Sequence, residues 1–189
     1  MTKDGCKTSL LALGANQAAH TQGNVLAVCA ALDHLGRIGH IRAVSGFWQT
    51  PAWPAGSGPD FVNACVALDS RLDPAELLAE LHAIEGRMGR VRTQRWGPRV
   101  IDHDLLAQGD LIRPDVAGLR HWMDLAPAEQ GTLAPDRLIL PHPRLHERGF
   151  VLVPLAEIAP DWLHPVLRLT VAALRARLPA PERAAIRRL

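Results

Sequence analysis

Residues 89–106, which read GRVRTQRWGPRVIDHDLL, bring strongly opposed charges together in a short stretch of chain. The first part carries four arginines, and Arg87 just upstream adds a fifth, whereas the second part carries Asp102 and Asp104. Crowded like charges repel one another, so any fold of this chain must give both groups counter-charges. A polyphosphate with Mg²⁺ meets both needs, because arginine donates paired hydrogen bonds to phosphate oxygens and Mg²⁺ binds carboxylates together with phosphates.

The spacing of the two aspartates adds geometric information. Residues 100–106 are apolar enough for a buried strand, in which residues two apart point to the same face. Asp102 and Asp104 would then project side by side, and His103 would point to the other face. The alternative is a solvated Asp-x-Asp at a strand edge beside a solvated basic loop. The Trp-Gly-Pro at 96–98, between the two halves, favours a functional site.

Composition limits the class of protein. The chain has 189 residues, 48% of them hydrophobic and 21% charged, which predicts one soluble globular domain over 1–189. The net charge of +2 does not indicate nucleic-acid binding, and no run approaches the ~20 apolar residues of a membrane span. Three scattered cysteines indicate reduced thiols in a cytoplasmic protein. There is no G-x-x-x-x-G-K-[ST] motif, so a P-loop does not hold the phosphates.

The order of predicted elements is β-α-β-β-α-β, the ferredoxin-like α+β pattern. The predicted strands are 9–13, 41–48, 61–68 and 100–106, with a further short strand at 138–140. Asn24 is expected to cap the first helix, which Gly36 ends, and Asp73 with Glu76 forms a capping box for the second. We expect an apolar turn or helix at 150–158, a C-terminal helix at 166–178 and a frayed basic tail.

One strand, 61–68, carries an aromatic ring and an amide on the same face. Phe61 alone is typical of a core residue, but Asn63 beside it needs hydrogen-bond partners if it is buried. A heteroaromatic ligand suits this pair, because the ring can stack on it and the amide can bond its edge.

The segment 111–137 is expected to be an insertion in the domain. Its apolar residues fall on nearly one helical face, with Asp115 as a possible N-cap. We therefore predict a helix at about 116–125 that packs through Trp122 and Met123 and flanks the nucleotide side of the domain.

The motif Arg95-Trp96-Gly97-Pro98-Arg99-x-x-Asp102-x-Asp104 closely resembles the signature of the 6-hydroxymethyl-7,8-dihydropterin pyrophosphokinase family of folate biosynthesis. Pro-His at 141–142 and Arg-x-Phe at 148–150 also match that family, and the resemblance covers roughly residues 8–160. It implies an α/β/α layering of the ferredoxin-like core. It also implies transfer of pyrophosphate from ATP to the hydroxymethyl group of the pterin, with release of AMP.

The resemblance further implies roles for particular residues of this chain. Two Mg²⁺ ions would bind Asp102 and Asp104, and Asp102 is the nearest candidate for a general base. The pterin would contact Thr50, Pro51, Phe61, Asn63 and Phe150. ATP would contact Glu85, Arg90, Arg92, Arg95, Trp96, Arg99, Leu105, His142 and Arg148. The catalytic set would be Arg90, Arg92, Arg99, Asp102 and Asp104. For Glu85, a salt bridge to a neighbouring arginine is an equally good interpretation.

Two other functions fit parts of the sequence. A metal-dependent phosphohydrolase would use the same carboxylates without a pterin. An RNA-binding module would use the arginines and Trp96 as a basic stacking surface, although Asp102 and Asp104 would repel a phosphate backbone. We expect the pterin enzyme, acting as a monomer with no nucleic-acid or membrane partner. His103 stands where the family usually has leucine, and Ala15 where it usually has serine.

Overall fold

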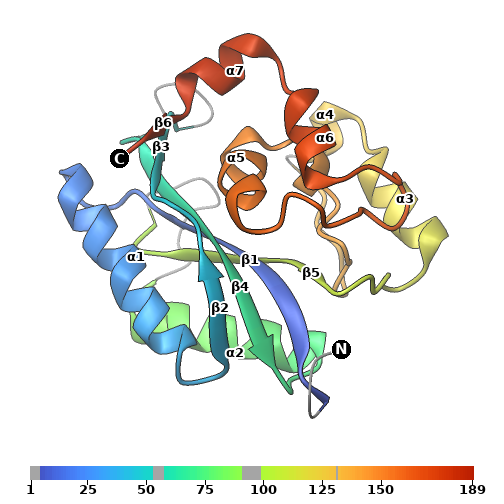
Figure 1. The fold of residues 1–189 in the computed structure, drawn as a ribbon, viewed down its shortest axis with the longest axis horizontal. Helices are drawn as coiled ribbons and strands as arrows, with labels where there is room; N and C mark the ends of the chain where they lie inside the picture. Colours follow the sequence, from blue (N-terminus) through green and yellow to red (C-terminus); the bar gives the residue numbers. More distant parts are fainter. Residues whose placement is uncertain (1–4, 53–57, 91–98, 131) are drawn as a thin grey trace.

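The computed structural model describes residues 5–52, 58–90, 99–130 and 132–189 (Figure 1). Its first half contains strand β1 (Lys7–Ala15), helix α1 (Thr21–Leu35), strands β2 (His40–Val44), β3 (Trp48–Thr50) and β4 (Phe61–Ser70), helix α2 (Pro74–Arg87) and strand β5 (Asp102–Gln108). Its second half contains α3 (Val116–Met123), α4 (Pro127–Gln130), the 3₁₀ helix η2 (Leu145–Glu147), α5 (Gly149–Ile158), α6 (Val171–Ala176), α7 (Ala180–Ala185) and β6 (Arg187–Arg188). The predicted mixed α+β class is confirmed.

The strands form one six-stranded antiparallel sheet with the order β5-β1-β4-β3-β6. Strand β2 pairs with β4 beside β3, so β4 is the central strand. Along β1, Gly14 lies opposite Asn63 of β4 and Asp102 of β5, which brings the two functional strands to the same end of the sheet. Among the described residues, no helix has the length and apolar character that crossing a membrane requires.

Strand alternation gives the sheet two apolar faces, and each face has its own helices. Leu11 and Leu13 pack with Leu81 and other buried residues of α1 and α2. Leu10 and Ala12, on the opposite face, pack with residues of α5 and α6. Figure 1 shows α5, α6 and α7 gathered across the sheet from α1 and α2.

Two local predictions about the first helices have different outcomes. The Asp73 capping box of α2 is confirmed, because its carboxylate accepts hydrogen bonds from the amides of Ala75 and Glu76. The prediction that Asn24 caps α1 is wrong, since the helix already begins at Thr21. Asn24 is a buried residue inside the helix, and its side chain bonds the backbone of Ala18, which folds the preceding loop against the helix.

Three predicted strands are also corrected. The strand expected at 41–48 is divided into β2 and β3, because the Ser45 hydroxyl accepts a hydrogen bond from the Cys65 amide at 2.9 Å and interrupts the ladder. The strand expected at 138–140 is only an isolated bridge between Leu140 and Arg113. The strand bearing the aspartates begins at Asp102 rather than at residue 100.

The predicted helix of the 111–137 segment is confirmed as α3, two residues shorter than expected. The Asp115 side chain caps it by accepting a hydrogen bond from the Gly118 amide at 2.8 Å. Its packing differs from the prediction, because Leu119 is the fully buried residue whereas Trp122 and Met123 are only half-buried.

The C-terminal region differs most from expectation. The apolar segment 150–158 is helix α5, but the helix expected at 166–178 is only the six-residue α6, whose start is capped by Thr170. The prediction of a frayed tail is wrong. Residues 180–189 form α7 and β6, β6 pairs with β3, and Ile186 is buried.

Candidate active site

Strand β5 presents its two aspartates to one side of the sheet. Asp102 and Asp104 are both half-buried, whereas His103 between them is 3% exposed and faces the opposite side. This alternation is what the spacing predicts for a strand with one solvated edge. The two carboxylates therefore lie side by side at the margin of the core.

Three arginines from separate parts of the chain pair with these carboxylates. Arg90 and Arg99 each donate to an oxygen of Asp102, and Nη1 of Arg148 lies 3.4 Å from Oδ2 of Asp104. The structure thus brings together the end of α2, the start of β5 and the start of α5.

The ionisation of Asp102 reflects this crowding. Burial raises its pKa and the charge of Asp104 raises it further, while the charges of Arg99 and Arg90 lower it; the pKa is raised overall. A divalent cation beside the pair would favour its ionised form. Among the described residues, no group of three or more His, Cys, Asp or Glu side chains is placed to hold a metal. Two carboxylates alone fit Mg²⁺, which completes its octahedron with phosphates and water.

Behind Asp102, Glu85 forms a buried support. Glu85 is 2% exposed, forms an ion pair with Arg90 and accepts a hydrogen bond from the His103 amide at 2.8 Å. Burial raises its pKa, but the His103 ring at 3.7 Å, the His103 amide and Arg90 together lower it to about 2. These contacts favour the salt-bridge interpretation of Glu85, and its contact with ATP stays a prediction.

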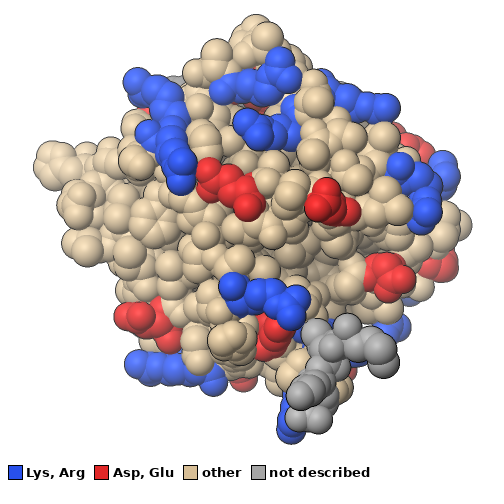
Figure 2. All heavy atoms as spheres, viewed as in Figure 1, with Lys and Arg blue, Asp and Glu red and all other residues tan. Residues whose placement is uncertain are grey.

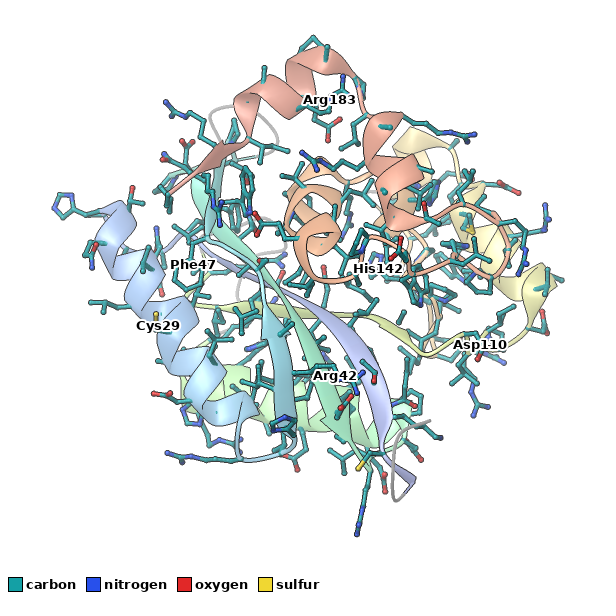
Figure 3. All side chains as sticks on the ribbon, viewed as in Figure 1. Cys29, Arg42, Phe47, Asp110, His142 and Arg183 are labelled. Carbon is teal, nitrogen blue, oxygen red and sulfur yellow. The ribbon has the colours of Figure 1, made fainter. Side chains whose placement is uncertain are left out.

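His142 lies between α5 and β5 (Figure 3), and its backbone amide donates to the Leu106 carbonyl at 2.7 Å. Its Nδ1 accepts a hydrogen bond from the Arg144 amide, so the neutral ring carries its proton on Nε2. Burial, followed by the charge of Arg148, lowers its pKa well below the usual value. His142 is therefore a neutral hydrogen-bond donor at neutral pH, next to the arginine at the start of α5.

Three of the predicted pterin residues, Thr50, Phe61 and Asn63, meet where β3 and β4 pair. Thr50 lies opposite Phe61 in the ladder, and the Asn63 amide donates to the Thr50 hydroxyl at 2.8 Å. Thr50 and Asn63 are each 5% exposed. Gly14 on β1 makes room for this pair, because a Cβ there would lie 2.9 Å from Oδ1 of Asn63. The site needs glycine at this point for close approach, not for an unusual backbone conformation.

The other residues predicted to contact substrate differ in how accessible their side chains are. The side chain of Leu105 is 3% exposed and packs in the core with α1 and α2, so only its backbone could face a nucleotide. Phe150 is exposed at the start of α5, with the Arg148 guanidinium 5.5 Å from its ring centre. Pro51 is exposed after β3. Arg92, Arg95 and Trp96 lie outside the described residues.

Asn16 belongs to this site, although the sequence did not single it out. It is 3% exposed, its Oδ1 accepts from the Arg99 amide at 2.8 Å, and its Nδ2 donates to the Pro59 carbonyl. The Asn16 and Gln17 amides both donate to the Arg99 carbonyl. Asn16 thus fixes the backbone of Arg99. The sequence signal that could have identified Asn16 is the Gly-x-Asn pattern at the end of a buried strand.

The RNA-binding alternative rests mainly on residues 91–98, which lie outside the described residues, so it stays a prediction. Figure 2 shows lysine and arginine side chains interspersed with acidic ones on the face in view, rather than gathered in one continuous basic area.

Comparisons with known proteins agree on one family. The family model described as 7,8-dihydro-6-hydroxymethylpterin-pyrophosphokinase matches residues 10–160. The chain is similar to 2-amino-4-hydroxy-6-hydroxymethyldihydropteridine pyrophosphokinases. It is 42% identical to that of Methylorubrum extorquens over 71% of this chain and 73% of the relative. With the Haemophilus influenzae protein the identity is 34% over 84% and 85%.

Other relatives are longer than this chain. The chain spans 49% of the Synechocystis relative, to which it is 43% identical. It resembles the solved Plasmodium falciparum HPPK-DHPS wild type with a TM-score of 0.65 and 17% identity, over 93% of this chain and 45% of that one. This structural likeness supports the fold alone.

Proposed function

The chain belongs to the 7,8-dihydro-6-hydroxymethylpterin-pyrophosphokinase family, and we propose that it makes the pterin diphosphate of folate biosynthesis from ATP and 6-hydroxymethyl-7,8-dihydropterin. AMP is the second product. The observation that carries the proposal is the convergence of Arg90, Arg99 and Arg148 on Asp102 and Asp104. That arrangement offers planar donors to phosphate oxygens beside a carboxylate pair suited to Mg²⁺.

In the proposed reaction the pterin hydroxyl oxygen forms a bond to the β-phosphorus of ATP, and the bond between that phosphorus and the α,β-bridging oxygen breaks. AMP leaves with the electron pair of that bond. Arg90, Arg99 and Arg148 stabilise the charge on the transferred group, together with Arg92 from outside the described residues. Asp102 is the candidate acceptor for the hydroxyl proton, and no other side chain is assigned this role. Asp102 and Asp104 would hold two Mg²⁺ ions, which would neutralise polyphosphate charge.

The binding residues divide into two groups. Phe61 stacks on the pterin from β4, Asn63 and Thr50 bond its edge beside Pro51, and Phe150 covers the second face from α5. His142 donates from Nε2 to a phosphate oxygen. Arg95, Trp96 and the Leu105 backbone contact the nucleotide, as does Glu85 unless its salt bridge to Arg90 is its whole role.

The architecture supports further proposals about the whole chain. The strand order, with β2 and β3 counted as one broken strand, fits a ferredoxin-like core in three α/β/α layers. We propose one domain over residues 1–189, with 111–137 as an insertion. We also propose a monomer in the cytoplasm with no nucleic-acid or membrane partner.

The test is incubation with ATP, Mg²⁺ and hydroxymethyldihydropterin, followed by separation of the nucleotides. AMP release that requires the pterin is expected, whereas phosphate release from ATP without pterin would indicate a phosphohydrolase. Asp102→Asn and Asp104→Asn keep shape and remove charge, so each should lower turnover by about 10²-fold or more. Asp110→Asn, at an exposed turn beyond the same strand, is the matched control. Near wild-type activity in either site variant would contradict the metal assignment.

A further inference from the structure

Residues 180–189, the C-terminal segment, lie beyond the part of the chain that the family model matches. The segment nevertheless contacts both walls of the proposed pterin site. One wall is the β3–β4 pair, and the other is the start of α5 (Figure 1).

The first contact is a strand pairing. Trp48 and Gln49 of β3 pair with Arg188 and Arg187 of β6, and the Leu189 amide donates to the Phe47 carbonyl at 2.9 Å. Thr50 is the next residue along β3. The pairing therefore holds the edge strand that carries the Thr50 hydroxyl.

The second contact joins α7 to the first turn of α5. The Glu182 carboxylate accepts a hydrogen bond from the Gly149 amide at 2.8 Å, between the two residues that are predicted to touch substrate, Arg148 and Phe150. A Cβ on Gly149 would lie 2.5 Å from Oε1 of Glu182 and 2.9 Å from Cδ1 of Ile186. The approach is therefore close enough that only glycine fits without displacement. Ile186 is 8% exposed and packs in the α5–α6 core.

A third contact links the two walls at the other end of α5. The Glu157 carboxylate accepts a hydrogen bond from the Gly46 amide at 2.6 Å and lies 3.7 Å from Nη2 of Arg188. The segment is thus attached to β3 directly, and to both ends of α5.

We propose that the C-terminal segment sets the distance and orientation between the β3–β4 wall and the start of α5, with Glu182 as the principal positioning residue. The inference rests on the proposed function, because it takes Thr50, Asn63 and Phe150 to be the pterin residues. It predicts a larger effect on pterin binding than on ATP binding. Among the proposed ATP contacts only Arg148, which pairs with Asp104, adjoins the segment's contact at Gly149, whereas Arg90 and Arg99 are held by Glu85 and Asn16.

The test compares Glu182→Ala, Glu182→Gln and Asp161→Ala, the last being an exposed carboxylate after α5 that serves as the control. Glu182→Ala should raise the pterin KM by about tenfold, the effect of one charge-assisted hydrogen bond, and raise the ATP KM by clearly less, since Arg148 is one of several ATP contacts. Glu182→Gln keeps an oxygen acceptor and should restore most of the affinity. Unchanged pterin KM in Glu182→Ala, or equal weakening for both substrates, would overturn the proposal.

A second measurement does not depend on activity. Amide hydrogen exchange without substrates should speed up around residues 47–52 and 148–152 in Glu182→Ala and in a chain ending at residue 179, and stay at the wild-type rate in Asp161→Ala. Unchanged exchange in Glu182→Ala would overturn the proposal, whether or not the shortened chain folds. If wild type makes no pterin diphosphate, the proposed function fails, and hydrogen exchange still decides whether the segment holds the two walls.

Discussion

Glu85 is a buried charge whose removal has a calculable effect. The substitution Glu85→Gln keeps the size of the side chain and an oxygen that can accept from the His103 amide, but it removes the charge that pairs with Arg90. The glutamine therefore imitates a glutamate held permanently in its protonated state.

The magnitude follows from the pKa of Glu85, which falls from 4.5 to about 2 on folding. At about 1.4 kcal/mol per unit, this difference corresponds to roughly 3 kcal/mol of folding stability at neutral pH. A lowered carboxyl pKa stabilises the folded state above the unfolded pKa. The contribution should therefore be complete above about pH 5.5 and be lost as the pH falls from 4.5 towards 2.

Urea unfolding of wild type and Glu85→Gln at several pH values from 7 to 3 measures this contribution. The variant should be less stable by about 2–3 kcal/mol at pH 7, and the difference should shrink steadily below pH 4.5. Asp33→Asn, an exposed position on α1, is the matched control and should cost less than about 0.5 kcal/mol. A difference below about 0.5 kcal/mol at pH 7, or one that does not change with pH, would refute the reasoning.

Three other predictions follow. His103→Leu should leave turnover and Mg²⁺ dependence intact, because the ring faces away from the carboxylate pair and the variant keeps the amide that bonds Glu85; a large loss of Mg²⁺ affinity would contradict the placement. Burial, and then the charge of His146, lowers the pKa of His164 to about 4, so stability should fall by up to about 3 kcal/mol between pH 6.5 and 4 as the unfolded chain takes up a proton. Nδ1 of His164 accepts hydrogen bonds from the Val166 and Leu167 amides, and asparagine keeps an acceptor near that position. Unfolding curves of His164→Asn should therefore show little of that loss. Replacing residues 113–136 by a short glycine turn should preserve kcat and lower Tm because Leu119 is removed from the core, and complete loss of turnover in a folded variant would show unrecognised catalytic groups.

Local sequence signals predicted the elements whose causes lie within a few residues. The Asp73 capping box and the Asp115 cap act within their own first turns, so α2 and α3 could be located from sequence. The side-by-side placement of Asp102 and Asp104 needs only the two-residue period of a strand. Each of these features is complete within one segment, and distant residues do not alter it.

Two of the errors, those in the 41–48 strand and in the C-terminal tail, occur where a distant residue decides the local structure. The Ser45 hydroxyl interrupts the expected 41–48 strand by bonding an amide twenty residues away, and the bond is visible only once β4 is alongside. The basic tail looks solvated in the sequence because its arginines by themselves give no sign of a buried surface. It becomes a strand because β3 has a free edge beside it and Glu157 faces Arg188.

The same reasoning explains why the residues that support the carboxylate pair could be only partly predicted from the sequence. Glu85 near the end of a helix is unfavourable for the helix dipole, and the sequence could suggest an arginine partner without identifying it. The partner is Arg90, and the His103 amide adds a hydrogen bond that any residue except proline could supply at position 103. The site can therefore accept either leucine, the residue usual in the family, or histidine at position 103 while the geometry that holds Asp102 is kept. The charge of Glu85 and the backbone path of β5 maintain that geometry. The side chain at position 103 adds the contribution of its own ring to the pKa of Glu85.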